Sequence, residues 1–295
     1  MSIAFLTRLP AEAAQAWLAA LRAALPEDDI LAGLAAGAEI AVVAAPAPGE
    51  LAKLPKLGFI QSAWAGVDGL LSDPLFPREI PLARLIDPSL AGQMAEAVAA
   101  HVLALHRRAP AYRAQQAQAL WRQLPQVSAH QRQVGLLGFG EMARASATML
   151  EKLGFQVSAW SRSHGDLASL LAASDIVVNL LPLTSRTNGV LGQETFARMK
   201  PGAAIINVGR GGHLVEADLI AALDEGQISH AVLDVFEPEP LPAGHPFWSH
   251  PAVTVLPHVA AITDPVSASQ RIAANIARFR AGEEIEGLVS RETGY

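Results

Sequence analysis

An arginine, a glutamate and a histidine in the second half of the sequence could together carry out acid–base chemistry on a small acid. Arg210 follows Asn-Val-Gly, Glu239 lies in the proline-rich stretch Glu-Pro-Glu-Pro, and His258 follows Leu-Pro. Histidine suits proton transfer near neutral pH, and a neighbouring carboxylate stabilises its charged ring. Arginine supplies a permanent charge and a fork that matches a carboxylate. Each could be an incidental loop residue, but the glycine and proline frames favour rigid, positioned loops.

A glycine-rich turn upstream has the pattern of a phosphate-binding site. The run Gly138-Phe139-Gly140-Glu141-Met142-Ala143 follows a predicted strand, Val134–Phe139, and opens a predicted helix that continues to Leu153. The first glycine permits a tight turn, the second lets the backbone approach a pyrophosphate, and the small residue at 143 allows close packing. The helix N-terminus then offers its N–H groups. The pattern alone could be a tight turn, but the flanking strand and helix favour dinucleotide binding.

The residues after the next predicted strand indicate which dinucleotide is bound. A free ribose 2′-OH is usually held by an acid about 20 residues after the glycines. This chain has Ser161-Arg162-Ser163 there, and Asp166 lies beyond the turn. A guanidinium between two hydroxyls suits a 2′-phosphate. We therefore expect NADP(H) to be preferred, with NAD(H) as the alternative.

Short aliphatic runs alternate with alanine-rich helical stretches, as in parallel sheets that are covered on both faces. In the first third the predicted strands are Ile3–Leu6, Ile40–Ala44 and Gly58–Ser62, with helices at Ala11–Ala24 and Val67–Leu71. In the second series the predicted strands are Val134–Phe139, Gln156–Trp160, Ile176–Leu181, Ala203–Val208, Ala231–Val235 and Thr254–Pro257, and a helix at Pro265–Ala281 follows. Between the series, residues 88–120 read as one long helix, interrupted only by Pro110.

The pattern predicts an α/β protein of two Rossmann- or flavodoxin-like domains, each a doubly wound parallel sheet, with a cleft between them. We expect a substrate domain at residues 1–90 plus 266–295 and a dinucleotide-binding domain at 91–265. The chain would pass between the domains near Pro88–Gly92 and Thr263–Pro265.

Composition excludes several classes of protein and site. The 295 residues are 51% hydrophobic and include no cysteine, which excludes disulfides, thiolate zinc sites and cysteine nucleophiles. The net charge of −6, without a basic run, argues against nucleic-acid or anionic-membrane partners. The first residues lack a basic leader, so we expect a cytoplasmic protein. Since there is no His-x-x-x-His motif or carboxylate-rich cage, we expect no metal site.

From about Gly58 onward the sequence resembles the D-isomer-specific 2-hydroxyacid dehydrogenases, and within them most closely the NADPH-dependent glyoxylate/hydroxypyruvate reductases. Besides the loops already named, the resemblance rests on Ala65-Gly66-Val67-Asp68, Ala91–Glu96, His106-Arg107-Arg108, Asn179–Thr184 and the terminal Gly294-Tyr295. Each motif is weak alone, whereas their combined order is specific.

The resemblance implies a role for each matching residue. Arg210 would bind and polarise a 2-oxo acid, Glu239 and His258 would form the acid–base pair, and Asp234 would lie near the nicotinamide carboxamide. The residues that would bind substrate are Trp64, Ala65, Gly66, Arg210 and His258. Those that would bind the cofactor are Gly138, Phe139, Gly140, Glu141, Met142, Ser161, Arg162, Ser163, Leu181, Pro182, Val208, Gly209, Arg210, Asp234, His258 and Ala260. We expect NADPH-dependent reduction of small 2-oxo acids to 2-hydroxy acids.

The sequence departs from the family pattern at two places and is compatible with one rival function. Trp64 stands where a small residue is expected, so its indole either narrows a substrate pocket or turns away. The stretch from Arg162 to Ile176 leaves room for a turn and one helix only, so the sheet would lack an edge strand. The rival is a non-catalytic dinucleotide sensor on the same scaffold. The long helix and the family both favour a homodimer.

Overall fold

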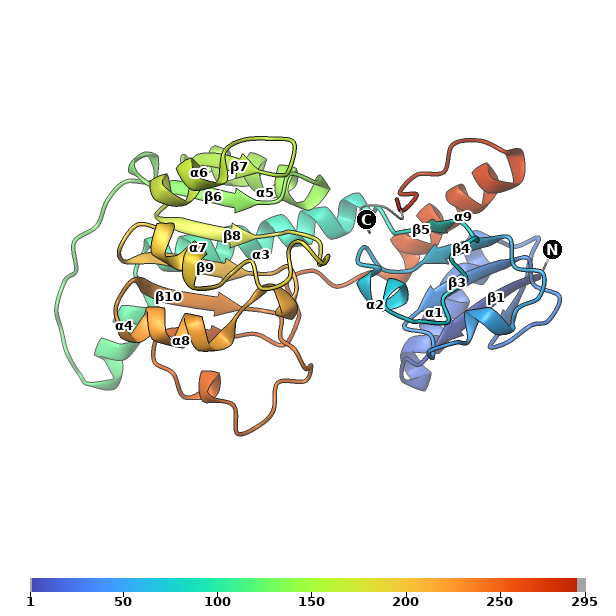
Figure 1. Ribbon diagram of the computed structural model, residues 1–295, viewed down its shortest axis with the longest axis horizontal. Coiled ribbons are helices and arrows are strands. Elements are labelled where there is room, and N and C mark those ends of the chain that lie inside the picture. The colour runs from blue at the N-terminus through green and yellow to red at the C-terminus, as the bar shows by residue number, and fades with distance from the viewer. Residues whose placement is uncertain (1, 291–295) are drawn as a thin grey trace. The chain divides into compact units, whose positions relative to one another are not determined.

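The computed structural model describes residues 2–290, and these form two compact units (Figure 1). The first unit contains the described residues up to Leu90 together with those from Thr263 onward. The second unit is Ala91–Ile262. The terminal Gly294-Tyr295 of the family pattern lies outside the described residues.

The first unit is built on a five-stranded parallel sheet. In space its strands follow the order β2-β1-β3-β4-β5, which is the flavodoxin-like order. The strands are β1 (Ser2–Thr7), β2 (Asp29–Ala32), β3 (Ile40–Ala44), β4 (Phe59–Ser62) and β5 (Leu82–Ala83); the helices are α1 (Ala11–Ala24), α2 (Asp68–Leu71) and α9 (Pro265–Ala281), with a 3₁₀ turn, η1, at Leu51–Lys53.

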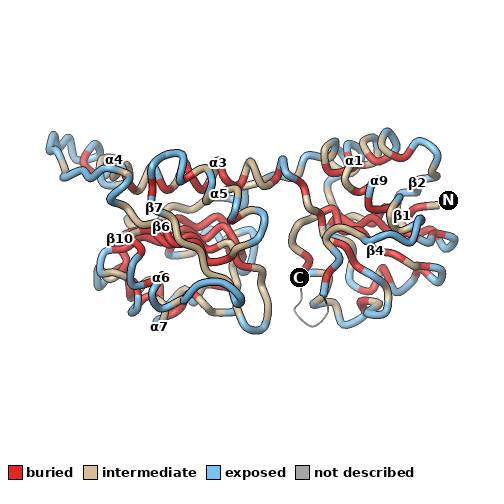
Figure 2. Tube along the Cα trace, turned by 90° about the horizontal axis from the view of Figure 1, so that it is seen from above, coloured by how far each residue is buried: buried red, intermediate tan, exposed pale blue. Residues whose placement is uncertain are grey.

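Both faces of this sheet are buried, which explains why its central strands read as continuous aliphatic runs. On one face, Trp17 and Leu21 of α1 and Ile272 and Ile276 of α9 pack against the strands. On the other face, the loops that carry Leu51 and Phe76 supply the cover. Figure 2 shows the buried strands at the centre of the unit.

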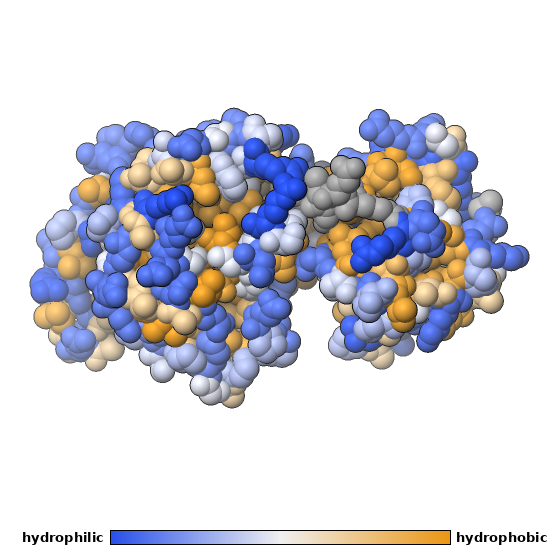
Figure 3. Space-filling model, viewed as in Figure 1, coloured by the Kyte–Doolittle hydropathy of each residue, from blue (hydrophilic) through white to orange (hydrophobic). Residues whose placement is uncertain are grey.

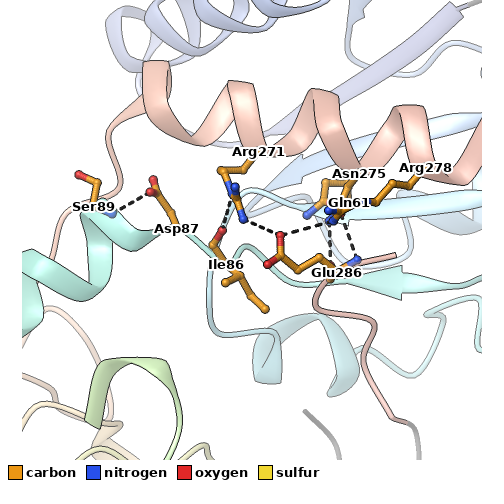
Figure 4. Close-up of polar contacts among 8 residues, drawn as sticks. All are labelled: Gln61, Ile86, Asp87, Ser89, Arg271, Asn275, Arg278 and Glu286. Carbon is orange, nitrogen blue, oxygen red and sulfur yellow. Dashed lines mark hydrogen bonds and ion pairs between the residues drawn. The ribbon is translucent and has the colours of Figure 1, made fainter. Parts of the chain in front are cut away.

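A buried polar network fixes the end of β4, from which the Ala65–Val67 loop departs (Figure 4). Gln61 is fully buried, and its Oε1 accepts a hydrogen bond from Asn275 Nδ2 of α9 at 2.9 Å. Asn275 Nδ2 also donates to the Glu286 carbonyl at 2.8 Å. The Glu286 carboxylate in turn accepts from Arg271, which also donates to the Ile86 carbonyl. Because buried polar groups are costly when unpaired, this network holds α9 and β4 in one register.

The two stretches where the chain passes between the units are each held by side-chain hydrogen bonds within a unit. In the first unit, Asp87 accepts from Ser89 N at 2.9 Å and from Ser267 Oγ at 2.7 Å (Figure 4 shows the first of these). In the second unit, the Gln93 amide exchanges two hydrogen bonds with the backbone of Ile262, at 3.0 and 3.1 Å.

The second unit contains a six-stranded parallel sheet in the order β11-β10-β9-β8-β6-β7. Its strands are β6 (Gln133–Leu137), β7 (Gln156–Trp160), β8 (Ile176–Asn179), β9 (Ala203–Asn207), β10 (Ile228–Leu233) and β11 (Val253–Val255). Its helices are α3 (Pro88–His106, whose first residues belong to the first unit), α4 (Ala109–Ala117), α5 (Glu141–Lys152), α6 (Leu167–Ala173), α7 (Gln193–Arg198) and α8 (Glu216–Asp224), with 3₁₀ turns η2 (Ala129–Gln131), η3 (Gly211–His213) and η4 (Pro246–Trp248).

Successive residues of these strands point to opposite faces, and each face has its own hydrophobic cluster. Val134, Ile176 and Ile206 pack with residues of α3 and α5. Leu137, Val177 and Ile205 pack with residues of α6, α7 and α8. The sheet is therefore doubly wound, as expected, with helices on both faces (Figure 2).

The expected single helix over residues 88–120 is wrong, because the structure contains two helices. Helix α3 ends at His106, Arg108 has a left-handed backbone with φ 57°, and α4 begins at Ala109. Pro110 lies in the first turn of α4, where its missing N–H costs nothing, whereas within a continuous helix it would remove a hydrogen bond and clash with the preceding turn.

The predicted strands and the helices at Ala11–Ala24 and Pro265–Ala281 are confirmed, with ends that differ by up to three residues. Two strands were missed. β2 and β5 lie at opposite edges of the first sheet, and β5 is only two residues long. The short stretch after Arg162 holds a turn and α6, and β7 is consequently the edge strand.

None of the helices in the described part of the chain is long and apolar enough to cross a membrane. Figure 3 shows hydrophilic residues distributed over the visible face of each unit, with smaller apolar patches between them.

The polar network beneath β4 generates a stability prediction. Replacing Asn275 with Ala leaves Gln61 Oε1 and the Glu286 carbonyl without this donor, at a cost of about 1–3 kcal/mol. We expect faster amide hydrogen exchange in β4 and α9 with no change in β6 and β8. The matched control is Gln270→Ala at an exposed position of the same helix, and equal exchange in the two variants would contradict the assignment.

Candidate active site

The parallel pairing of β6–β11 places the carboxyl ends of all six strands at one edge of the second unit. The loops that follow these strands, together with the first turn of α5, carry every predicted cofactor residue as well as Arg210, Glu239 and His258. The direction in which successive strands are added reverses at β6, since β7 lies on one side of it and β8 on the other. Ligands of open α/β sheets bind at such a switch point.

The glycine-rich turn lies at this switch point. Gly138 has φ 114°, a conformation that side-chain-bearing residues rarely adopt, and a Cβ there would lie 2.9 Å from the Leu180 carbonyl of the β8 loop. Gly138 N donates to the Trp160 carbonyl at 2.8 Å, which fixes the turn to the end of β7. A Cβ on Gly140 would meet nothing within 4 Å. Open space therefore lies in front of the first turn of α5, where the helix presents its N–H groups.

Glu141 and Met142 open α5 behind this turn, and they differ in environment. Glu141 is exposed and lies 3.8 Å from Arg144, one turn along the helix, while Met142 packs partly into the cluster under α3 and α5. The Arg144 guanidinium also lies 5.0 Å from the centre of the Phe139 ring. Arg144, whose charge lies near the N-terminus of α5, was not among the residues predicted from sequence.

Ser161, Arg162 and Ser163 form a closed turn at the end of β7. Ser161 N donates to the His164 carbonyl at 2.8 Å, and His164 N donates back to Ser161 at 3.0 Å. The His164 ring stacks on Phe139 at 4.3 Å with an interplanar angle of 5°. This stack joins the Arg162 turn to the glycine turn. His164 was missed because nothing in sequence indicates a ring stack across two loops.

The Arg210 loop leaves β9 and approaches the next loop closely. A Cβ on Gly211 would overlap the carbonyl group of Phe236, so only glycine fits there. The Arg210 guanidinium donates to the Gly209 carbonyl at 2.8 Å, and Val208 is buried in the core beneath. The arginine loop is thereby held against the start of the loop that carries Glu239.

Glu239 and His258 form a hydrogen-bonded pair. His258 Nδ1 lies 2.8 Å from Glu239 Oε2, and Glu239 Oε1 accepts from Phe236 N at 2.9 Å. A carboxylate only accepts, so Nδ1 carries the hydrogen and Nε2 is directed elsewhere. The side chain of His258 is 48% exposed, so the ring is open to solvent and to a ligand.

Asp234 holds the backbone that carries His258. It is 1% exposed, and its two oxygens accept from Val259 N at 2.8 Å and from Ala260 N at 2.9 Å. His258 has a left-handed backbone with φ 54°, which costs roughly 1–2 kcal/mol for an L-residue. The two charge-assisted bonds to Asp234 stabilise this unusual conformation. Burial of His101 lowers the pKa of that histidine, and this effect is larger than the opposing effect of the negative charge of Asp234.

The segment Leu181-Pro182 follows β8 and is held by a buried network that the sequence analysis missed. Asn179 at the end of β8, Asn207 at the end of β9 and His213 in η3 are all fully buried. Asn179 Nδ2 lies 2.9 Å from Asn207 Oδ1 and 2.8 Å from His213 Nδ1. The available signal was the occurrence of an amide side chain as the last residue of two neighbouring buried strands.

The predicted substrate residues Trp64, Ala65 and Gly66 lie in the first unit, after β4. The Trp64 ring packs edge-on against Trp17 at 5.9 Å and 89°, as part of that unit's core. The indole of Trp64 is therefore in contact with the core of the first unit. The backbone of Trp64 is fixed by a hydrogen bond from its N to Ser62 Oγ at 3.0 Å.

Within residues 2–290, no group of three metal-ligating acids or histidines comes together. A cavity of about 250 Å³ exists in the second unit, but His106, Arg132 and Asp175 line it at the amino-terminal edge of the sheet. It therefore lies at the edge opposite to the candidate site.

Comparison with known proteins identifies the class that this fold and site define. Residues 99–260 match the model of the D-isomer specific 2-hydroxyacid dehydrogenase NAD-binding domain. The chain belongs to the D-isomer-specific 2-hydroxyacid dehydrogenase family, and it is accordingly an oxidoreductase with a domain for a nicotinamide dinucleotide.

Particular relatives share nearly the whole chain. Glyoxylate/hydroxypyruvate reductase A of Serratia proteamaculans is 40% identical, with 96% of both chains covered. The protein of the same name from Photorhabdus laumondii is 42% identical over 88% of both chains. Among solved structures, a Xanthobacter autotrophicus D-isomer specific 2-hydroxyacid dehydrogenase in complex with NADPH and MES has a TM-score of 0.94 at 36% identity, covering 100% of this chain and 99% of that one. A Sinorhizobium meliloti NADPH-dependent glyoxylate/hydroxypyruvate reductase with NADP and sulfate has a TM-score of 0.93 at 34% identity, with the same coverage.

The contact at Gly211 generates a prediction about this site. In Gly211→Ala, the added methyl group must separate the Arg210 loop from Phe236, because a backbone carbonyl cannot rotate away as a side chain could. We expect a loss of about 1–3 kcal/mol, as for other overpacked sites, and faster hydrogen exchange in residues 209–213 and 236–239. Gly244→Ala is the control, since a Cβ there meets nothing within 4 Å. Two variants of equal stability would contradict the close approach.

Proposed function

We propose that this enzyme reduces small 2-oxo acids, such as glyoxylate and hydroxypyruvate, to 2-hydroxy acids with NADPH. The observation that carries the proposal is the 2.8 Å contact between His258 Nδ1 and Glu239 Oε2. This pair lies at the sheet edge from which the Arg210 loop also leaves. The activities for which the Serratia and Sinorhizobium relatives are named support the same reaction. The non-catalytic sensor gains no support from any of these relatives.

The residues at the switch point fit a dinucleotide. Open space faces Gly140 and the first turn of α5, and the tight turn at Gly138 brings backbone rather than side chains to that space. Leu181-Pro182 and the Val208-Gly209 backbone would line the cofactor, and Ser161, Arg162 and Ser163 would receive its 2′-phosphate. When bound, the reduced nicotinamide supplies a hydride to the carbonyl carbon of the substrate.

The chain's own residues then supply charge, orientation and a proton. Arg210 would bind the substrate carboxylate and polarise the 2-oxo group. His258 would deliver the proton from Nε2 to the oxygen that becomes the hydroxyl group. Glu239 would hold the ring in that orientation and stabilise its charged form through Nδ1. The hydride on carbon and the proton on oxygen are the two hydrogens that the 2-oxo acid gains on reduction.

We propose that the first unit is the substrate domain and the second unit the dinucleotide-binding domain. Their boundaries would be those predicted from sequence, with 1–90 plus 266–295 and 91–265. The backbone of Ala65 and Gly66 would receive the substrate carboxylate, for which the fixed backbone beside Trp64 is the supporting observation.

We further propose a cytoplasmic homodimer. The segment after α4 presents three apolar side chains to solvent: Leu120 is 43% exposed, Trp121 97% and Val127 40%. Such a concentration of exposed apolar groups is typical of an interaction surface. A second copy of the chain is the proposed partner. Light scattering on the purified protein measures its molar mass, which should be twice that of one chain.

The acid–base assignment predicts the effects of two substitutions. His258→Ala removes the proton donor and should lower kcat by about 10²–10⁴-fold. Glu239→Gln keeps the donor but loses one charge-assisted hydrogen bond, so a loss of about tenfold to a hundredfold is expected. Steady-state oxidation of NADPH with glyoxylate measures both. His130→Ala, an exposed histidine of η2 at the opposite edge of the sheet, is the control, and near-normal turnover by His258→Ala would refute the assignment.

Cofactor preference predicts the effect of removing Arg162. A charge-assisted hydrogen bond contributes roughly 1.5–3 kcal/mol, so the wild type should prefer NADPH over NADH by about tenfold to a hundredfold in kcat/KM. Arg162→Ala should lose most of this preference and leave NADH almost unaffected, since NADH has no 2′-phosphate. The exposed Arg198→Ala on α7 serves as control. Equal kcat/KM for the two cofactors on the wild type would contradict the role of this turn.

A further inference from the structure

We propose that His213 is a positioning residue that fixes the arginine loop through one ring nitrogen and the cofactor-lining segment through the other. The proposal rests on the function proposed above. His213 is fully buried in η3, three residues after Arg210, and has no ligand-binding role in that proposal.

The hydrogen bonds of the ring define its tautomer. His213 Nε2 lies 3.2 Å from the Pro182 carbonyl, which can only accept, so Nε2 carries the hydrogen. Nδ1 then holds the lone pair, and it accepts from Arg210 N at 3.2 Å and from Asn179 Nδ2 at 2.8 Å. A proton on Nδ1 would point at the N–H groups of Arg210 and Asn179, and neither hydrogen bond could then form. The ring therefore works as a neutral, two-ended connector.

The partners of His213 belong to two different loops. On the Nδ1 side, Arg210 is also held through its carbonyl, which accepts from Asn207 Nδ2 at 3.1 Å. On the Nε2 side, the Pro182 carbonyl also accepts from Thr187 Oγ1 at 2.7 Å. Leu181 N reaches Asn179 Oδ1 at 3.3 Å, which closes the network across β8 and β9.

This arrangement gives separable functions to the two halves of one side chain. The Nδ1 half sets the main chain at Arg210, and hence the guanidinium that would bind the 2-oxo acid. The Nε2 half sets the carbonyl at Pro182, and hence the segment that would line the dinucleotide. A ring that only filled space would affect both loops together.

Two substitutions separate the halves because each retains a polar atom near one nitrogen. In His213→Asn, Oδ1 can accept in place of Nδ1, but no atom reaches Pro182. In His213→Gln, Nε2 can donate to Pro182, but no acceptor remains for Arg210 N. We expect His213→Asn to raise the KM for NADPH about fivefold with little change in the KM for glyoxylate. We expect His213→Gln to raise the KM for glyoxylate and lower kcat by a similar factor, with little change for NADPH.

Amide hydrogen exchange tests the same division without catalysis. Residues 181–184 should exchange faster in His213→Asn and residues 209–212 faster in His213→Gln, each with the other segment as in the wild type. If the wild type fails to reduce 2-oxo acids, the proposed function fails, while the exchange pattern still decides the role of His213.

The proposal would be overturned if each variant changed the exchange of both segments and both KM values in proportion to its loss of thermal midpoint. It would also be overturned if both variants behaved like the wild type. Should neither variant fold, Asn207→Asp keeps His213 and removes the second bond to the Arg210 carbonyl. It should loosen residues 209–212 and raise the KM for glyoxylate alone. Loosening of residues 181–184 to the same extent would count against separable halves.

Discussion

The functional architecture depends on the parallel hydrogen bonding of six strands in the second unit. Since parallel strands all end at one edge, six loops from distant parts of the sequence lie there as a result of strand pairing alone. Burial of both sheet faces fixes the strands, and it leaves the loops as the variable part. The chemistry of the site is therefore a property of the loops, and its precision is a property of the strands beneath them.

Precision at this edge comes from polar groups that are themselves buried. Asp234 determines the backbone of His258, and Asn179, Asn207 and His213 determine the loops on either side of Arg210. Leaving one member of such a network unpaired costs more than the bond contributes, so these loops have little freedom to rearrange. The groups that would meet ligands, by contrast, lie at the surface of the network. His258 pairs with Glu239 on its Nδ1 side, and its Nε2 is the atom proposed to meet the substrate.

Much of this arrangement could be predicted from sequence, for identifiable reasons. Strands that are buried on both faces appear in the sequence as short aliphatic runs. The glycines between Gly138 and Ala143 are recognisable because only small residues fit that turn. The edge strands β2 and β5 were missed because a strand with one neighbour and few residues leaves little periodic signal. The long helix was misread because left-handed Arg108 follows ordinary helix formers, so the residues before Pro110 give no sign of a break. His213 and His164 were missed because their roles depend on contacts between loops, which spacing along the chain does not encode.

We propose that the edge built by Arg210, Glu239 and His258 reduces a 2-oxo acid rather than sensing a cofactor. The most direct measurement follows NADPH consumption and product together, with hydroxypyruvate as substrate and the D- and L-forms of the 2-hydroxy acid resolved. We expect one molecule of D-2-hydroxy acid for each NADPH consumed, at a rate far above that without substrate. Tight binding of NADPH with no consumption above background on hydroxypyruvate, glyoxylate, pyruvate or phenylpyruvate would contradict it.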